Sequence, residues 1–130
     1  MANRNYLSQS LHDRVIQAAA VNLGNWTVYS NPGQQKNAYI GNAYPDIILT
    51  NRATNNIEFV IEVETSDSVT AHEAYGQWKQ YANLPGTFYL LVPRESRQNA
   101  AFFCNQYGIQ AKFGTYWVDM YNQIQIHYES

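Results

Sequence analysis

Two strand-like segments separated by a short polar connection constrain the fold of this chain more than any other feature. The first segment runs from Asp46 to Asn51 and the second from Ile57 to Glu64, and both are rich in residues typical of strands. The connection, residues 52–56, reads Arg-Ala-Thr-Asn-Asn and is typical of a loop. This spacing predicts an antiparallel hairpin in which Asp46 lies opposite Glu62 and Asn51 lies opposite Ile57.

This register gives the hairpin one apolar face and one acidic face, because residues two apart on a strand share a face. The apolar face is expected to carry Ile47, Leu49, Ile57, Phe59, Ile61 and Val63. The other face carries Asp46, Glu62 and Glu64 beside Ile48 and Val60. Carboxylates this close repel one another, and a divalent cation would relieve the repulsion. The alternative is an acidic strand face that is simply solvated.

The remaining periodicities predict helices and strands on both sides of the hairpin. Helices are expected at residues 10–23, 70–83 and 95–107, and strands at about 87–92 and 116–126, with a short strand around Trp26 and Val28 before a turn at residues 29–33. The run Thr87 to Val92 is nearly all apolar, as in a strand covered on both faces. The order α-β-β-β-α-β-α-β predicts an α/β fold with a mixed central sheet flanked by helices, in one domain spanning residues 1–130.

Composition excludes several classes of protein. Eight Lys and Arg against ten Asp and Glu give a net charge of −2, which excludes a strongly basic, histone-like protein. The only cysteine is Cys104, so neither an intrachain disulfide nor a site built from several thiolates can form. The first residues lack the apolar run of a signal peptide, and the longest apolar stretch is Phe88 to Val92. We therefore expect a soluble cytoplasmic protein with no membrane span.

Three motifs together resemble the PD-(D/E)xK nuclease superfamily, which has the restriction-endonuclease-like fold. They are Tyr44-Pro45-Asp46, then Glu62-Val63-Glu64 at the end of the next strand, then Gln77-Trp78-Lys79 on the following helix. The αβββαβ core of that superfamily corresponds to residues 11–92, and residues 62–93 also resemble uncharacterised prokaryotic members. The sequence departs from the pattern at Glu64, where the motif has lysine. Some active members carry glutamate there, and others have moved the lysine to the following helix.

The resemblance implies a metal-dependent nuclease site. Asp46 and Glu62 would hold Mg²⁺ or Mn²⁺, ions that prefer carboxylate oxygens, and Glu64 would support the metal or the attacking water. Lys79 would stabilise charge on the phosphate, and Gln77 would flank the same site. For both helix residues, an exposed position without a role is the alternative.

Other polar residues have competing interpretations. His12 lies on the apolar side of the first helix, as a hydrogen-bonded core residue or as a group facing the site. Asp13 follows Ser10, and Glu73 follows Thr70, at the spacing of a helix capping box. Five basic residues are candidates for phosphate contacts: Arg4, Lys36, Arg52, Arg94 and Arg97.

The leading function is metal-dependent phosphodiester hydrolysis of DNA, with a homodimer expected because one small acidic domain offers few phosphate contacts. The second hypothesis is a catalytically inactive nuclease-fold protein that acts as a nucleic-acid-binding or assembly module. A third, weaker one is a carboxylate-based hydrolase such as a glycosidase, for which the sequence shows no sugar-binding groove.

Overall fold

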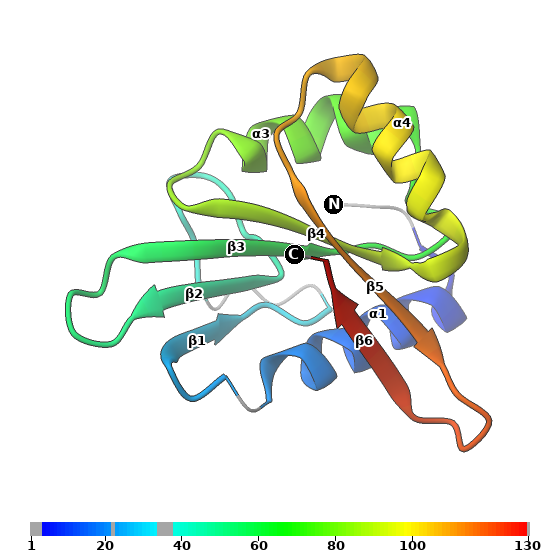
Figure 1. Ribbon diagram of the computed structural model, residues 1–130, viewed down its shortest axis with the longest axis horizontal. Coiled ribbons are helices and arrows are strands. Elements are labelled where there is room, and N and C mark those ends of the chain that lie inside the picture. Colours follow the sequence, from blue (N-terminus) through cyan, green and yellow to red (C-terminus); the bar gives the residue numbers. More distant parts are fainter. Residues whose placement is uncertain (1–3, 22, 34–37, 130) are drawn as a thin grey trace.

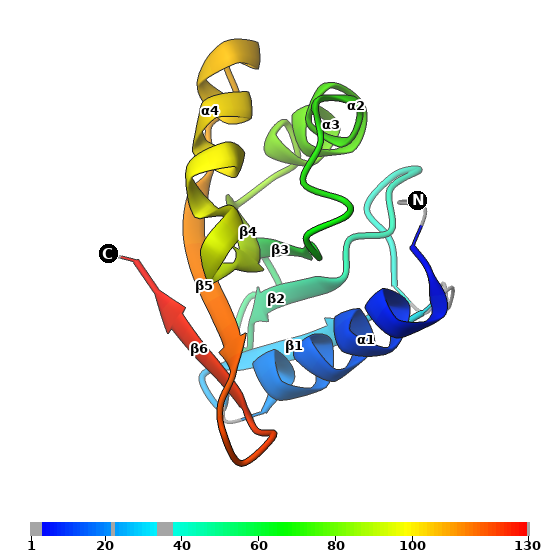
Figure 2. The ribbon, with the colours of Figure 1, turned by 90° about the vertical axis from the view of Figure 1, so that its right-hand side faces the viewer.

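The computed structural model describes residues 4–21, 23–33 and 38–129 and has an α/β fold. Its centre is one curled, six-stranded mixed sheet with strand order β1-β2-β3-β4-β5-β6, and helices lie on both faces (Figures 1 and 2). The elements are α1 (Tyr6–Ala20), β1 (Trp26–Ser30), β2 (Ile47–Asn51), β3 (Ile57–Val63), α2 (Ala71–Glu73), η1 (Ala74–Trp78), α3 (Lys79–Ala82), β4 (Thr87–Pro93), η2 (Arg94–Ser96), α4 (Arg97–Tyr107), β5 (Lys112–Val118) and β6 (Ile124–Tyr128).

The predicted hairpin is confirmed, with one irregularity near its loop. Strand β2 pairs antiparallel with β3, and Ile47 lies opposite Ile61 as expected. The register then shifts, so that Thr50 rather than Asn51 pairs with Ile57. Such a bulge reverses the face on which the following side chain lies. Ile57 therefore packs with the core beneath α2 and α3, which corrects its predicted place on the other face.

The sheet combines antiparallel and parallel pairs, as predicted for a hairpin followed by helical crossovers. Strands β3, β4 and β5 run parallel, whereas β1 with β2 and β5 with β6 are antiparallel pairs. In β4, Leu90 packs in the core on one face of the sheet and Leu91 in the core on the other. The prediction that this strand is covered on both faces is therefore confirmed.

Helix α1 begins and ends earlier than predicted. It starts at Tyr6, and the Asn5 side chain caps it by accepting a hydrogen bond from the Ser8 backbone N–H at 2.8 Å. The capping box assigned to Ser10 and Asp13 is therefore wrong, because both residues lie inside the helix. Its buried side, Val15, Ile16 and Ala19, packs on the apolar face of the β2–β3 hairpin.

The helix predicted at residues 70–83 forms, with a wider turn in its middle. Thr70 caps α2 by accepting from the Glu73 backbone N–H at 3.2 Å, which confirms that Thr70 caps this helix. The chain continues through the π-helical segment η1 into α3. Trp78, at the end of η1, is completely buried. Wide turns of this kind often occur at functional sites.

The C-terminal region holds one more strand than predicted. We expected a single strand over residues 116–126, but β5 and β6 form an antiparallel hairpin. Between them Asn122 adopts a positive φ of 61°, and the Asp119 carboxylate accepts from two backbone N–H groups of the turn. Asparagine and aspartate favour such turns, and the sequence carries this signal. Within the described ranges, no helix is long and apolar enough to cross a bilayer.

Candidate functional site

The hairpin brings Asp46 and Glu62 into direct contact, as its predicted register requires. The Asp46 backbone N–H donates to Glu62 Oε1 at 3.1 Å. The Val63 backbone N–H donates to Asp46 Oδ2 at 2.8 Å. Both acids are nearly buried, with exposed fractions of 7% for Asp46 and 6% for Glu62. We call these two residues the acid pair.

The acid pair gathers negative charge in a poorly solvated space. Burial raises the pKa of Glu62 well above its ordinary value, and the negative charges of Asp46 and Glu64 raise it further. Ionisation of a carboxyl group in such surroundings is disfavoured because it would place a second negative charge in a poorly solvated space. A bound cation would relieve this cost.

His12 of α1 contacts the acid pair from the side. Its Nε2 lies 3.0 Å from Asp46 Oδ2, and its Nδ1 lies 3.0 Å from Asp13 Oδ1. Burial lowers the pKa of His12, but its hydrogen bond with Asp46 and the charge of that carboxylate outweigh burial, so the pKa is raised overall. His12 is therefore both a buried, hydrogen-bonded residue and a group that faces the site, so the two interpretations are compatible.

Asp13 fixes His12 in place. Its Oδ1 accepts from the Gly33 backbone N–H at 2.8 Å and from Gln9 Nε2 at 3.0 Å, in addition to its contact with His12. Burial raises the pKa of Asp13, but these hydrogen bonds outweigh it and lower the pKa overall. A charged Asp13 thus orients the imidazole toward Asp46 and ties α1 to the segment that follows β1.

Glu64 lies at the end of β3 in a different environment from the acid pair. It is completely buried, and its carboxylate accepts from Arg4 Nη2 at 3.3 Å and from Trp78 Nε1 at 3.0 Å. The Ser68 hydroxyl donates to the same carboxylate. Burial raises the pKa of Glu64 to about 7, although Arg4, Ser68 and Trp78 all act to lower it. We call these four residues the Glu64 network.

Arg4 is the residue of this network that the sequence analysis misplaced. We expected it to contact phosphate, but its side chain is only 4% exposed and donates to Glu64, to the Val63 carbonyl oxygen at 3.1 Å and to Thr65 Oγ1 at 3.0 Å. Ser68 was not predicted at all. The Ser- and Thr-rich segment that follows Glu64 was the available signal, because such residues form turns that bind nearby polar groups.

The structure leaves Lys79 away from the carboxylates. Its side chain is exposed, and its Nζ lies 5.6 Å from the centroid of the Tyr75 ring. Tyr75 in turn contacts Tyr107 of α4, with ring centroids 5.7 Å apart. Among the described residues, Lys79 forms no ion pair with Asp46, Glu62 or Glu64. Gln77, on the same helix, is half-buried.

The donor groups suit a metal held by two residues rather than three. In the part of the chain that the structure describes, no group of three or more His, Cys, Asp and Glu is arranged to hold a metal ion. Glu64 is unsuited because its two carboxylate oxygens already face Arg4, Ser68 and Trp78. The acid pair offers the oxygen ligands that Mg²⁺ and Mn²⁺ prefer, and a cation there would offset the repulsion between the two carboxylates.

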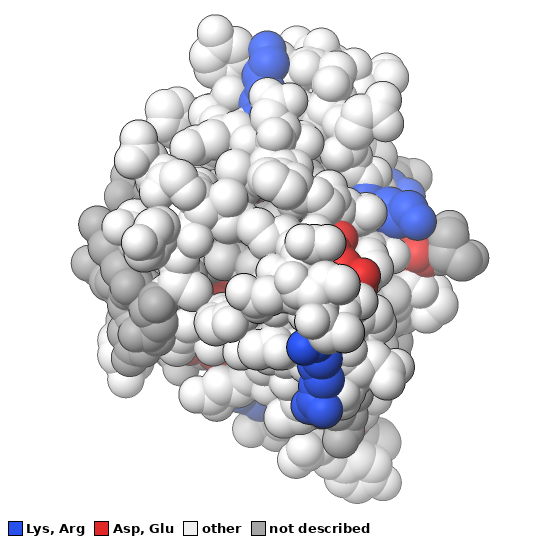
Figure 3. All heavy atoms as spheres, turned by 90° about the vertical axis from the view of Figure 1, so that its left-hand side faces the viewer, with Lys and Arg blue, Asp and Glu red and all other residues white. Residues whose placement is uncertain are grey.

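Most basic candidates for phosphate binding have partners within the protein. The Arg94 guanidinium lies 4.4 Å from the centroid of the Trp117 ring, and Arg97 forms an ion pair with Glu129 at 2.6 Å. Lys36 lies outside the described residues. On the molecular face in Figure 3, the basic groups are scattered rather than gathered in one patch, and acidic groups lie near some of them.

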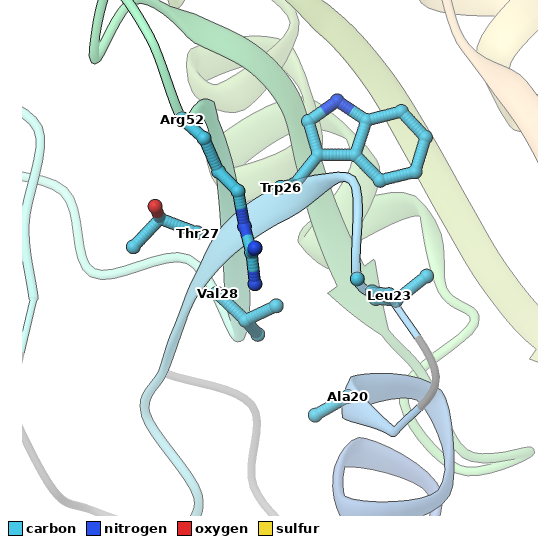
Figure 4. Close-up of a pocket in the computed structure, with 7 residues that line it drawn as sticks. Ala20, Leu23, Trp26, Thr27, Val28 and Arg52 are labelled. Atoms are coloured by element: carbon cyan, nitrogen blue, oxygen red, sulfur yellow. The ribbon is translucent and has the colours of Figure 1, made fainter.

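Arg52 borders an open pocket of about 650 Å³ between the end of α1 and strand β1. Its side chain extends alongside Thr27 and Val28 of β1 (Figure 4). Asp46 and Arg52 are separated by the length of β2, about 20 Å at the rise of a strand. Arg52 is therefore too distant to belong to the site of the acid pair.

Comparisons with known proteins add no family assignment. The sequence matches no protein-family model, and the searches of curated proteins and of solved structures found no match. The function is therefore argued from the contacts of the site itself.

Proposed function

We propose that this protein is a metal-dependent phosphodiesterase that acts on DNA, with a restriction-endonuclease-like core. The observation that carries the proposal is the acid pair, where two nearly buried carboxylates meet and the pKa of Glu62 is raised by burial and by the charge of Asp46. The order of α1, β1–β3, the α2–α3 helix and β4 is also that of the αβββαβ core. Asp46 and Glu62 would hold Mg²⁺ or Mn²⁺.

Each side chain around the acid pair has a role in this proposal. The ion, when bound, would polarise a phosphate oxygen and lower the pKa of a water molecule. His12 holds the Asp46 carboxylate in place through its hydrogen bond. Glu64 is a positioning residue that anchors the end of β3 to Arg4 and Trp78. The exposed Lys79 side chain would have to leave Tyr75 to contact a bound phosphate.

A second candidate is a catalytically inactive nuclease-fold module for nucleic-acid binding or assembly. It is favoured by the surroundings of Glu64, the position where the superfamily motif has lysine. Arg4 is the cation nearest to it, and its charge is balanced by Glu64. In this second candidate the acid pair has no catalytic role, and Lys79 remains at the surface.

Thermal unfolding with and without Mn²⁺ tests the metal site. Wild-type protein should gain stability in millimolar Mn²⁺, because an ion that binds only the folded state stabilises it by mass action. Asp46→Asn should abolish that gain, whereas Glu95→Gln, which changes an exposed acid outside the site, should retain it. Each variant is compared with and without the ion, since Asp46→Asn also relieves repulsion. No gain in the wild type would contradict the metal site.

Nuclease assays separate the two candidates. If the protein is an enzyme, wild type should nick plasmid or branched DNA in the presence of Mg²⁺ or Mn²⁺. Asp46→Asn and Lys79→Ala should both lose this activity. A wild type that binds the metal but cleaves no form of DNA or RNA would favour the inactive module.

The proposal includes a homodimer, because a second copy would double the few surfaces available to DNA. Exposed apolar side chains that could form a contact include Met120 and Tyr121 between β5 and β6, which are 88% and 78% exposed. Sedimentation at micromolar concentration should show a species of twice the 14.9 kDa chain mass. A monomer under these conditions would contradict the dimer.

A further inference from the structure

A second cavity lies on the sheet face that carries Glu62. It has a volume of about 330 Å³ and is bounded by β1, β2 and the segment Ala38–Ile40. Tyr29 and Ile48, which are directly paired across β1 and β2, form part of its floor.

The cavity is close to the acid pair. Ile48 follows Asp46 by two residues and pairs with Val60, which precedes Glu62 by two. Residues two apart share a face and are separated by about 7 Å along a strand. The acid pair does not itself line the cavity, and its residues lie about 7 Å along the strands from the nearest lining residue, Ile48. This spacing suits a nucleotide whose base lies in the cavity and whose phosphate lies near the acid pair.

The lining suits a flat, partly polar ring system. Tyr39, which is 67% exposed, and Tyr29 present aromatic rings, and Ile48 contributes an apolar surface. The Thr50 hydroxyl donates to Asn55 Oδ1 at 3.2 Å, so the amide of Asn55 is oriented with its NH₂ group able to donate to another acceptor. Aromatic rings stack on nucleobases, and an amide can hydrogen-bond to the edge of a base.

The charge of the protein favours contact with bases over contact with phosphates. The chain has a net charge of −2, and the guanidinium groups of Arg4 and Arg97 form ion pairs within the protein. Binding that depends on phosphate neutralisation would therefore be weak. Bases are accessible for stacking only when they are unpaired.

We propose that this cavity binds one unpaired base of single-stranded DNA, next to the phosphate at the acid pair. This inference rests on the proposed function and narrows its substrate class. Tyr39 is the principal stacking residue, and Asn55 contacts the edge of the base. Base-paired DNA fits less well, because its bases are stacked within the helix and cannot enter the cavity.

Fluorescence anisotropy in EDTA tests the inference without cleavage. The probe is a labelled oligo-dT of about 12 nucleotides, a length within the range of known single-strand binding sites. Its binding is compared with that of the duplex it forms with oligo-dA. Wild type should bind the single strand more tightly. Tyr39→Ala should weaken this binding by about 5- to 150-fold, the loss expected for one stacked base, and Tyr39→Phe should retain it. Tyr6→Ala, another exposed tyrosine, is the matched control and should bind like wild type.

The outcomes separate this inference from the proposed function. Equal binding by wild type and Tyr39→Ala, at unchanged melting temperature, overturns the base site. Tighter binding of the duplex also overturns it, and so does failure to bind the single strand. If wild type nevertheless gains stability in Mn²⁺ and nicks plasmid DNA, the proposed function stands with a different substrate class. An equal loss in Tyr6→Ala would show that the effect is not specific to the cavity and would overturn the base site as well.

Discussion

Glu64 and the acid pair lie on the same hairpin but are neutralised in different ways. Glu64 is completely buried, and Arg4, Ser68 and Trp78 supply its hydrogen bonds. The acid pair has backbone N–H donors and His12, yet the pKa of Glu62 remains well above its ordinary value because of burial and the nearby charges. The difference indicates that Glu64 stabilises the end of β3, whereas the acid pair is the place where we propose that a cation binds.

Removing the cation of the Glu64 network should have the largest effect. Arg4→Ala leaves Glu64 buried without its ion-pair partner, and we expect the free energy of unfolding at pH 8 to fall by about 3–5 kcal/mol. Urea denaturation measures the change. Arg14→Ala, which removes an exposed contact with the Asn122 carbonyl oxygen, is the control and should lose less than about 1 kcal/mol. A loss for Arg4→Ala as small as that of the control would contradict the difference drawn between Glu64 and the acid pair.

Neutralising the acid pair should instead raise the free energy of unfolding at pH 8. The pKa of Glu62 is higher in the folded than in the unfolded protein, so its contribution to stability is complete below pH 4.5 and is lost as pH rises through the folded pKa. Wild type should therefore be less stable at pH 8 than at pH 5. Glu62→Gln should gain about 1–3 kcal/mol at pH 8, because the buried position no longer ionises.

Urea denaturation of Glu62→Gln at both pH values checks this expectation. Part of the pH dependence should remain in the variant, because burial raises the pKa of Glu64 to about 7 and that of His12 is raised overall by Asp46. Glu95→Gln, at an exposed position, should behave like wild type. Destabilisation of Glu62→Gln at pH 8 would mean that the negative charge of the acid pair is already balanced in the wild type.

The smallest effect is expected for a single donor of the Glu64 network. Trp78→Phe keeps an aromatic ring in the core but removes the indole N–H that donates to Glu64 at 3.0 Å. We expect a loss of about 1–2 kcal/mol, less than for Arg4→Ala, because the ion pair and the Ser68 hydrogen bond remain. Thermal and urea unfolding measure it. A loss larger than that of Arg4→Ala would identify Trp78 rather than Arg4 as the main partner of Glu64.

Much of the fold could be predicted because its elements carry local patterns. A pattern within a few residues predicts each of three elements: the alternating hairpin, the helix capped by Thr70 and the apolar strand β4. The start of α1 and the separation of β5 from β6 depend on single caps and turns, such as Asn5 and Asn122, which are weaker signals. The register shift between Leu49 and Thr50 has no signal that we could identify in the sequence.

The site could be predicted only where its residues share one local element. Asp46 and Glu62 meet through the hairpin register, which the sequence encodes. Arg4 reaches Glu64 from 60 residues away, and this contact depends on how α1 packs against the sheet. Lys79 was assigned from a motif, but its contact with Tyr75 depends on the surface between two helices. Tertiary packing therefore decides which charges are neutralised.

The sequence separations between the contacting residues of the site also predict which contacts form first during folding. Asp46 and Glu62 are 16 residues apart, whereas His12 is 34 residues from Asp46 and Arg4 is 60 residues from Glu64. Short loops close with less loss of entropy, so the hairpin can form before α1 docks. The early hairpin then holds its acids without His12 or Arg4 beside them. Mild acid, which protonates these carboxylates, should therefore accelerate folding by lowering the repulsion in the transition state.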